Sequence, residues 1–515
     1  MVKDGKILIG KAGDEEIYIY PKMANRHGMI AGATGTGKTV TLKVMAESFS
    51  NMGVPVFLAD VKGDLAPLCK VGEANENVTS RIEKMGLQDA GFEYQSYPVN
   101  FWDVYAEKGM PLRTTISEMG PLLLSRIMGL NDIQSDILNI IFKIADDEGL
   151  LLIDTKDLKS MVQYVGEKSK EYSAQYGNIA AASLNAITRG IVTMESEGAD
   201  QFFGEPALSI TDWLCTDSNG KGMIQILDCQ KLIMHPKMYS TFLLWMMSEL
   251  FEILPEVGDP EKPKMVFFFD EAHMLFDLAS KVLLEKIEQV VKLIRSKGVG
   301  IYFITQNPKD IPDGVLAQLS NKVQHALHAY TPAEQKGAKA AAMAFRANPE
   351  FDTYTVLQEL GTGEALVSVL DEAGVPTVVK KTKICPPQSN MGTLEDGTRN
   401  SMINNCLLYS RYSNAVDRDS AYEFLQRREA EVQETAVKEA EQLSLTKQKE
   451  KEIAARKKAT NNAVKSVAKT TAGTIGRQVG KTLGSSIGGS FGKTLGGNIG
   501  ASLGRGIMST LFSGK

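Results

Sequence analysis

The octapeptide GATGTGKT occupies residues 32–39, between an apolar run, GMIAGA, and a helix-forming run, TVTLKVMAESFS. Its spacing, GxxxxGK[ST] in the order strand, loop, helix, is typical of a loop that holds nucleotide phosphates. Glycines let backbone N–H groups curl around an oxyanion, and the N-terminus of the following helix adds a favourable dipole. The sequence therefore predicts a phosphate-binding loop inside an α/β fold.

The side chains and backbone of this loop are the expected ligands of the nucleotide. Lys38 would reach the β- and γ-phosphates, and the Thr39 hydroxyl would ligate Mg²⁺. The predicted cofactors are accordingly ATP and Mg²⁺, and no NKxD-type guanine-specific motif stands in the sequence. The remaining loop positions expected to contact the phosphates are Gly32, Thr34, Gly35, Thr36 and Gly37.

Apolar runs alternate with helical patterns through most of the chain. Runs that are apolar on both faces indicate a mostly parallel sheet with helices on both faces. The runs are GMIAGA, VPVFLAD, GMIQILDC, KMVFFFDEA, GIYFITQ, KVQHALHAY and GEALVSVL.

Two of these runs end in polar side chains suited to hydrolysis. The strand KMVFFF ends in Asp270 and Glu271, which we expect to hold Mg²⁺ and to polarise the attacking water, respectively. An N-cap pair after the strand is the structural alternative. Gln306, after GIYFIT, would orient the water or sense hydrolysis, or simply open the turn before Asn307-Pro308.

Other polar residues near strand ends have two interpretations. Asp60 and Asp64 lie where ligands of open α/β sheets gather, yet a role in the turn is equally compatible. Lys62, Lys309 and Lys322 would line a pore or lie in solvated loops.

Composition limits the class of protein. The chain has 515 residues, a net charge of −5, 43% hydrophobic and 23% charged residues, which is typical of a globular protein. At roughly 100–200 residues per domain we expect two to four domains. Five isolated cysteines, no signal-peptide h-region and no apolar run long enough to span a bilayer predict a cytoplasmic protein.

Changes in pattern divide the chain into segments. An N-terminal β-hairpin (1–25) leads into a core (26–110 and 199–385), which is interrupted by an all-helical insertion (111–198). A polar linker (386–419) and a charged helix (420–458) follow. The last segment, 459–515, repeats glycine at every fourth position from Gly476 to Gly504, each preceded by an apolar residue.

The glycine repeat would form a basic amphipathic helix with a ridge of small residues. Residues 457–515 carry nine Lys or Arg and no acidic residue. Small ridges permit close helix–helix approach, whereas a basic amphipathic face suits a membrane surface. Helix association in an oligomer, membrane-surface binding through residues 470–515, and disorder all remain open.

The ordered set GATGTGKT, LADVKGDL, FFFDEAH, LIRSKGVGIYFITQNP and LGTGEALV resembles the HerA/FtsK superfamily of P-loop ATPases over residues 5–385. The resemblance is greatest to HerA-like bacterial ATPases of the YjgR type. It implies a RecA-like core, a ring that is usually hexameric, ATP bound between subunits, and DNA translocation.

The resemblance also implies roles for arginines. Arg295, in LIRSKGVG, matches the arginine finger that acts on a neighbour's γ-phosphate, and Arg26 matches a basic residue that approaches the phosphates. Arg346 is a further candidate, and helix-end or turn positions exposed to solvent are the structural alternatives. Only about 25 residues precede the phosphate-loop strand, in place of the N-terminal barrel of HerA, so a nuclease partner is not expected.

Three functions are compatible with these features. The first is a ring ATPase that moves DNA, with Lys38, Glu271, Gln306 and Arg295 as catalytic residues. The second is a P-loop ATPase that acts on a protein client or at a membrane surface through its basic tail. The third, a nucleotide-gated scaffold, does not require the general base Glu271.

Overall fold

The computed structural model describes residues 1–276 and 281–459. Its centre is one sheet with the strand order β1-β2-β13-β12-β11-β4-β10-β9-β5-β8-β6-β7, and β3 pairs with β2. The eight strands from β11 to β7 are parallel, whereas β12, β13 and the hairpin strands β1–β3 pair antiparallel. The predicted mostly parallel α/β fold is confirmed.

All seven apolar runs quoted above are strands. The strands are β1 (Val2–Lys3), β2 (Lys6–Ala12), β3 (Glu15–Ile19), β4 (Gly28–Ala31), β5 (Val56–Asp60), β6 (Val99–Asp103), β7 (Met110–Pro111), β8 (Ile224–Asp228), β9 (Met265–Phe269), β10 (Val299–Thr305), β11 (Asn321–His325), β12 (Glu364–Ser368) and β13 (Lys380–Ile384).

The helices are distributed between the core and a helical region. Those of the core are α1 (Lys38–Asn51), α2 (Glu76–Met85), α8 (Ala199–Phe202), α9 (Pro236–Ile253), α10 (His273–Phe276), α11 (Lys281–Ile294), α12 (Asp313–Leu316), α13 (Pro332–Met343), α14 (Thr353–Glu359), α15 (Asp396–Asn404) and α16 (Tyr409–Tyr412). The others are α3 (Ile116–Met128), α4 (Asp132–Asp147), α5 (Thr155–Glu167), α6 (Ser169–Tyr176), α7 (Ala181–Ser196) and α17 (Ala421–Ala459).

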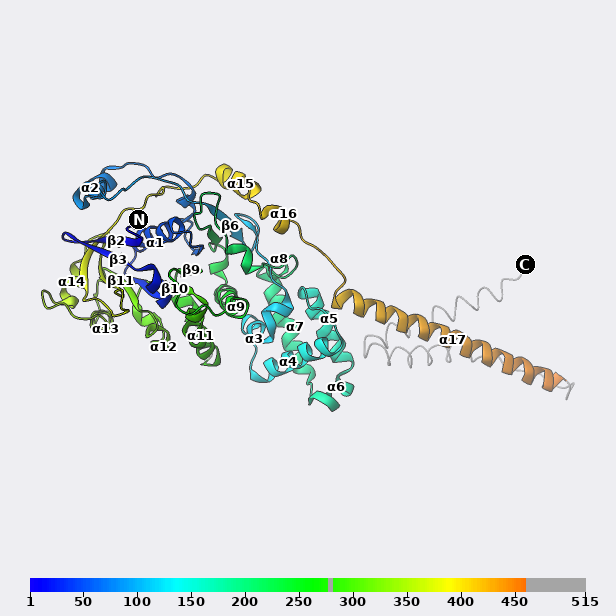
Figure 1. The fold of residues 1–515 in the computed structure, drawn as a ribbon. Helices are drawn as coiled ribbons and strands as arrows, with labels where there is room; N and C mark the ends of the chain where they lie inside the picture. The colour runs from blue at the N-terminus through cyan, green and yellow to red at the C-terminus, as the bar shows by residue number, and fades with distance from the viewer. Residues whose placement is uncertain (277–280, 460–515) are drawn as a thin grey trace. The chain divides into compact units, whose positions relative to one another are not determined.

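Crossover direction places the core helices on both faces of the sheet. The connection β4–α1–β5 runs toward β7, whereas β8–α9–β9 and β9–α11–β10 run back toward β4. Right-handed crossovers that run in opposite directions place their helices on opposite faces. Helix α1 therefore covers one face, and α9 and α11 cover the other (Figure 1).

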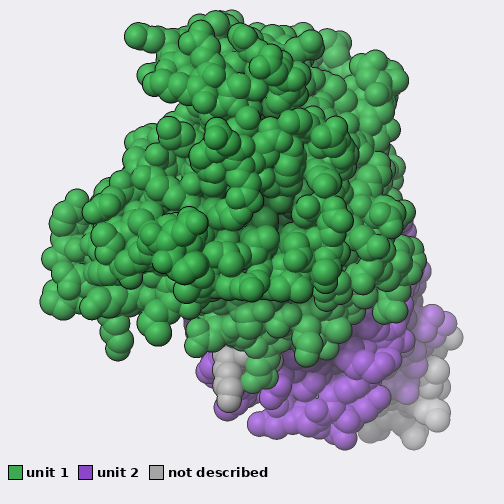
Figure 2. Space-filling view, turned by 60° about the vertical axis from the view of Figure 1, so that its left-hand side comes forward, with its two compact units in different colours: residues 1–115, 196–416 green, residues 116–195, 417–515 purple. Residues whose placement is uncertain are grey.

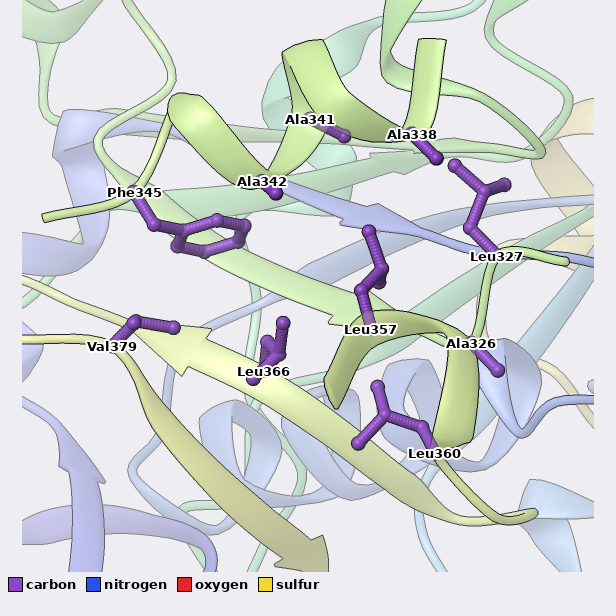
Figure 3. Packing of buried hydrophobic residues seen from close by; sticks show 10 residues of the cluster. All are labelled: Ala326, Leu327, Ala338, Ala341, Ala342, Phe345, Leu357, Leu360, Leu366 and Val379. Atoms are coloured by element: carbon purple, nitrogen blue, oxygen red, sulfur yellow. The ribbon is translucent and has the colours of Figure 1, made fainter. Parts of the chain in front are cut away.

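Two helices cover the sheet at β11 and β12. Helices α13 and α14 pack on these strands through a buried apolar cluster, in which Leu357 of α14 points toward Leu327 and Ala338 (Figure 3). Because each leucine or phenylalanine contributes about 1.5–3 kcal/mol when buried, this cluster stabilises the position of the chain that follows β11.

The chain divides into two compact units, coloured separately in Figure 2. The first comprises residues 1–115 and 196–416 and contains the sheet. The second comprises residues 116–195 together with the described part of the segment that begins at 417, so it is helical. Inside it, the Asp157 carboxylate caps α5 and also accepts hydrogen bonds from Ser420 Oγ (2.6 Å) and Tyr422 N–H (2.8 Å), which ties the start of α17 to α5.

Several features were not expected from the sequence. Strands β6, β7 and β13 extend the sheet, and the N-terminal hairpin joins it through the pairing of β2 with β13. Within the expected linker, Gln388, Ser389 and Asn390 are buried, and α15 and α16 follow. The glycine-rich segment 459–515 lies, apart from its first residue, outside the described residues. Within 1–276 and 281–459, none of the helices has both the length and the apolar character needed to cross a bilayer.

Candidate functional site

The phosphate loop connects β4 to α1 at the carboxyl edge of the parallel strands. Gly35 and Gly37 have φ values of +78° and +114°, a backbone region that favours glycine. The Lys38 ammonium folds over the loop and donates to the carbonyl oxygens of Gly32 (2.7 Å) and Ala33 (3.0 Å). Burial lowers the pKa of Lys38, and the nearby Lys62 charge lowers it further. The loop thus has the conformation of a phosphate-binding loop, and the Lys38 amino group points into it.

A buried histidine supports this loop from β11. His325 Nδ1 lies 3.0 Å from Glu364 O, so it must donate, and Nε2 then accepts from Thr41 Oγ1 at 2.8 Å. Burial lowers the pKa of His325 to about 4, which keeps the ring neutral. A side chain at Gly32 would lie 2.6 Å from His325 Cβ, so the loop can approach β11 only with glycine there.

The acidic pair lies at the end of β9, two strands from β4 in the sheet order. Asp270 Oδ1 accepts the Glu271 N–H at 2.9 Å, and Tyr239 of α9 donates to the Asp270 carbonyl at 2.8 Å. Glu271 has φ +48°, an uncommon conformation for a side chain other than glycine. Burial raises the pKa of Asp270 to about 6. The turn thus holds both carboxylates at the carboxyl edge.

Three polar side chains surround the Glu271 carboxylate. Gln306 Nε2 donates to Oε2 at 3.3 Å, and His273 Nδ1 lies 3.5 Å from the same oxygen. Lys62 Nζ lies 3.3 Å from Oε1. The register pairs Thr305 with Ala31, so Gln306 stands between the phosphate loop and Glu271. The structure therefore brings together Lys38, Asp270, Glu271 and Gln306.

Asp60 has a structural role in the turn that follows β5. Its Oδ1 accepts from Gly63 N–H (2.7 Å) and its Oδ2 from Leu65 N–H (3.1 Å). Burial raises its pKa to about 7. Of the two interpretations considered for Asp60, the structure supports the turn, whereas Asp64 is exposed.

The two arginines implied by the resemblance lie at the edge of the sheet opposite the phosphate loop. Arg26 precedes β4 and Arg295 precedes β10, at the amino ends of these parallel strands, whereas the phosphate loop and Gln306 follow their carboxyl ends. Both arginines pair with Asp259, at 3.5 Å and 3.2 Å. At about 3.3 Å per residue, seven-residue β10 spans roughly 23 Å, so neither can reach the nucleotide of its own chain. Arg346 is exposed and donates to Pro376 O at 3.1 Å.

Comparison with known proteins agrees with this geometry. Residues 6–508 match the profile of the family described as "Helicase HerA-like C-terminal". The chain belongs to this family. A relative from Sulfurisphaera tokodaii, named DNA double-strand break repair helicase HerA, is 23% identical over 388 residues, which is 74% of this HerA-like chain and 70% of the relative.

Solved structures show the fold of this HerA-like chain. The bacterial conjugative coupling protein TrwBdeltaN70 in an unbound form, and the plasmid coupling protein TrwB in complex with a non-hydrolysable ATP analogue, each align with a TM-score of 0.50 and 14% identity. Each alignment covers 76% of this chain and 93% of the other. The HerA/FtsK resemblance and the RecA-like P-loop fold predicted from the sequence are confirmed.

The oxygen donors of this HerA-like chain fit Mg²⁺. The Thr39 hydroxyl begins α1, and the buried Asp270 carboxylate ends β9; both offer the hard oxygen ligands that Mg²⁺ prefers. Among the described residues, no group of three His, Cys, Asp or Glu side chains could hold a metal. An ion at Thr39 and Asp270 would have one hydroxyl, one carboxylate, waters and the nucleotide's own phosphates as ligands.

Sequence reasoning about the HerA-like motifs missed three supporting residues. Tyr239 lies inside an apolar helix and resembles any core tyrosine, and His325 ends an apolar strand, where its position was the only signal. Lys62 was expected to line a pore or to lie in a solvated loop. Its contact with Glu271 was missed because it depends on the pairing of β5 with β9.

Proposed function

We propose that this chain is a Mg²⁺-dependent ATPase of the HerA/FtsK type that acts as a DNA-translocating motor. The observation that carries the proposal is the position of Glu271, whose Oε2 lies 3.3 Å from Gln306 Nε2 beside a formed phosphate loop. A nucleotide-binding scaffold would need Lys38 but no carboxylate at this place. The matched family and the HerA relative named a DNA double-strand break repair helicase support the DNA client.

Each residue has a role that follows from its chemistry. Backbone N–H groups of the loop and the Lys38 ammonium bind the phosphates, and Lys38 must leave the Gly32 and Ala33 carbonyls to do so. Glu271 accepts a proton from the attacking water, while the Gln306 amide orients that water or the carboxylate. Thr39 and Asp270 would hold Mg²⁺, which offsets negative charge on the phosphates.

A second copy would complete this site. Arg26 and Arg295 are separated from their own phosphate loop by the length of the strands. In a ring, the amino-end surface of one subunit would face the carboxyl-edge loop of the next, and Arg295 would stabilise transition-state charge there. The ring itself, usually hexameric in the family that the sequence resembles, is part of this proposal.

The test is ATP turnover by the full chain alone, with double-stranded DNA and with single-stranded DNA, at two salt concentrations. Glu271→Gln is the control, because the amide keeps the shape of the side chain and cannot accept the proton. Stimulation by DNA that weakens with salt and disappears in Glu271→Gln is expected of the motor. If neither form of DNA alters turnover, the proposed ATPase activity stands. The proposed DNA translocation would then be refuted in favour of a protein or membrane-surface client.

A further inference from the structure

The Glu271 carboxylate is engaged at both oxygens by groups from neighbouring strand ends. Gln306, which follows β10, donates to Oε2 at 3.3 Å, and Lys62, which follows β5, lies 3.3 Å from Oε1. An oxygen held by an ammonium group is less free to receive a proton from water. The Lys62 contact therefore opposes the role of proton acceptor proposed for Glu271.

The turn that carries Lys62 is built to keep it beside Glu271. Asp60 anchors the turn through the N–H groups of Gly63 and Leu65, and Gly63 has φ +78°. The Lys62 side chain is nevertheless 42% exposed, whereas that of Glu271 is 10% exposed. A fixed backbone with a half-exposed, flexible side chain allows the ammonium group to change partners while its anchor stays in place.

The local charges favour such an exchange. Lys38, Lys62, Asp270 and Glu271 balance as two cations and two anions. A bound nucleoside triphosphate adds a terminal phosphate whose charge exceeds that of a carboxylate, so the attraction on a nearby ammonium group is greater. Lys38 lies within the loop, where it would bind the phosphates, and Lys62 is a further cation beside Glu271.

We propose that Lys62 is a positioning residue that restrains Glu271 until a nucleoside triphosphate binds, and then transfers to the terminal phosphate, which leaves Glu271 free to act on water. The inference deepens the proposed ATPase function and rests on it. It also distinguishes triphosphate from diphosphate, since only the former presents the group that draws Lys62 away.

The experiment compares binding and turnover in the full chain carrying Lys62→Met or Lys62→Arg. Binding of ATPγS and of ADP is measured by calorimetry, and kcat and KM are measured with ATP. Lys62→Met should weaken ATPγS at least about tenfold, the value of one charge-assisted contact, and leave ADP within about twofold. Its kcat should fall about 10- to 100-fold, because a cation at the phosphate stabilises the transition state. Lys62→Arg should restore ATPγS affinity to within about threefold, since the charge is kept.

Lys231→Met is the matched control. Lys231 also follows a parallel strand, β8, and also pairs with a glutamate, Glu107 at 2.6 Å, but that pair is exposed. It should leave both affinities unchanged. Equal loss of ATPγS and ADP binding in Lys62→Met, or no loss of either, would overturn the proposal. If wild-type turnover does not exceed that of Glu271→Gln, the ATPase proposal fails, while the ratio of the two affinities still decides the role of Lys62.

Discussion

Glu47 anchors the segment that follows the last strand of the sheet, and replacing it should destabilise the first unit. Glu47 lies on α1 and is 1% exposed. Its carboxylate accepts three hydrogen bonds: Gln388 N–H at 2.8 Å, Ser389 N–H at 3.0 Å and Ser389 Oγ at 2.5 Å. On the same helix, Lys43 Nζ donates to Asn390 O at 2.5 Å.

The magnitude follows from the donors that Glu47→Ala would strand. Each buried N–H or hydroxyl left without an acceptor costs about 1–3 kcal/mol, and water entering the new cavity relieves part of that cost. We therefore expect a loss of about 3–5 kcal/mol in the free energy of unfolding. Glu47→Gln keeps one acceptor and turns an N–H₂ group toward donors, so it should lose about 1–3 kcal/mol. Ser389→Ala removes a single bond and should lose about 1 kcal/mol.

The assay is urea unfolding of the full chain, followed by tryptophan fluorescence, with limited proteolysis as a second measurement. Release of the segment should expose residues 386–392 to protease in Glu47→Ala before global unfolding. Trp102, Trp213 and Trp245 are buried in the first unit and report on its unfolding. The reasoning would be refuted if the free energy of unfolding of Glu47→Ala lay within 1 kcal/mol of the wild-type value. It would also be refuted if Ser389→Ala lost more stability than Glu47→Ala.

Three further predictions concern the core and the loop. Leu357→Ala should lower the free energy of unfolding by about 2–5 kcal/mol in a urea titration, because Leu357 is fully buried in the cluster of Figure 3. Burial lowers the pKa of His27 and of His325 to about 4, so the unfolded chain binds protons at a higher pH than the folded chain, and stability decreases as the pH is lowered. Each histidine should cost about 2 kcal/mol of stability between pH 7 and pH 5. His325→Gln should reduce the slope of unfolding free energy against pH. Gly32→Ala should reduce ATPγS binding at least tenfold by calorimetry, whereas Gly13→Ala, which has positive φ but open space around it, should bind normally.

The sequence was informative where several signals agreed. An apolar run bounded by a phosphate-loop motif or by an acidic pair identifies a parallel strand and its carboxyl end, and these runs became β4 and β9. Strand β13, KKTKI, was not predicted. Its lysines alternate with Thr382 and Ile384, so only one face is buried, and that pattern is common in exposed segments too. It pairs with β12 on one side and with β2, about 370 residues earlier in the chain, on the other.

The site was predictable in its parts and less so in its contacts. Lys38, Asp270 and Glu271 follow from motifs, because each chemistry needs one residue type at one spacing. The contact of Lys62 with Glu271 depends on strand register, which a single sequence does not display. Gln388, Ser389 and Asn390 were expected in a polar linker. They are buried because α1 supplies Glu47 and Lys43, and polar composition indicates exposure only where no such partner exists.

The Asp157 contact has a consequence for how the chain is made. Its carboxylate joins α5 to residues 420–422, and Ser420 lies 263 positions further along. During synthesis, the insertion therefore leaves the ribosome long before the helix that packs on it. Helix α5 therefore lacks the start of α17 until all the remaining strands of the sheet, β8 to β13, have been translated. A chain that ends at residue 386 would lack α17, so α5 would stay without its partner. A truncation that tests the role of the C-terminal segment should therefore end the chain after α17.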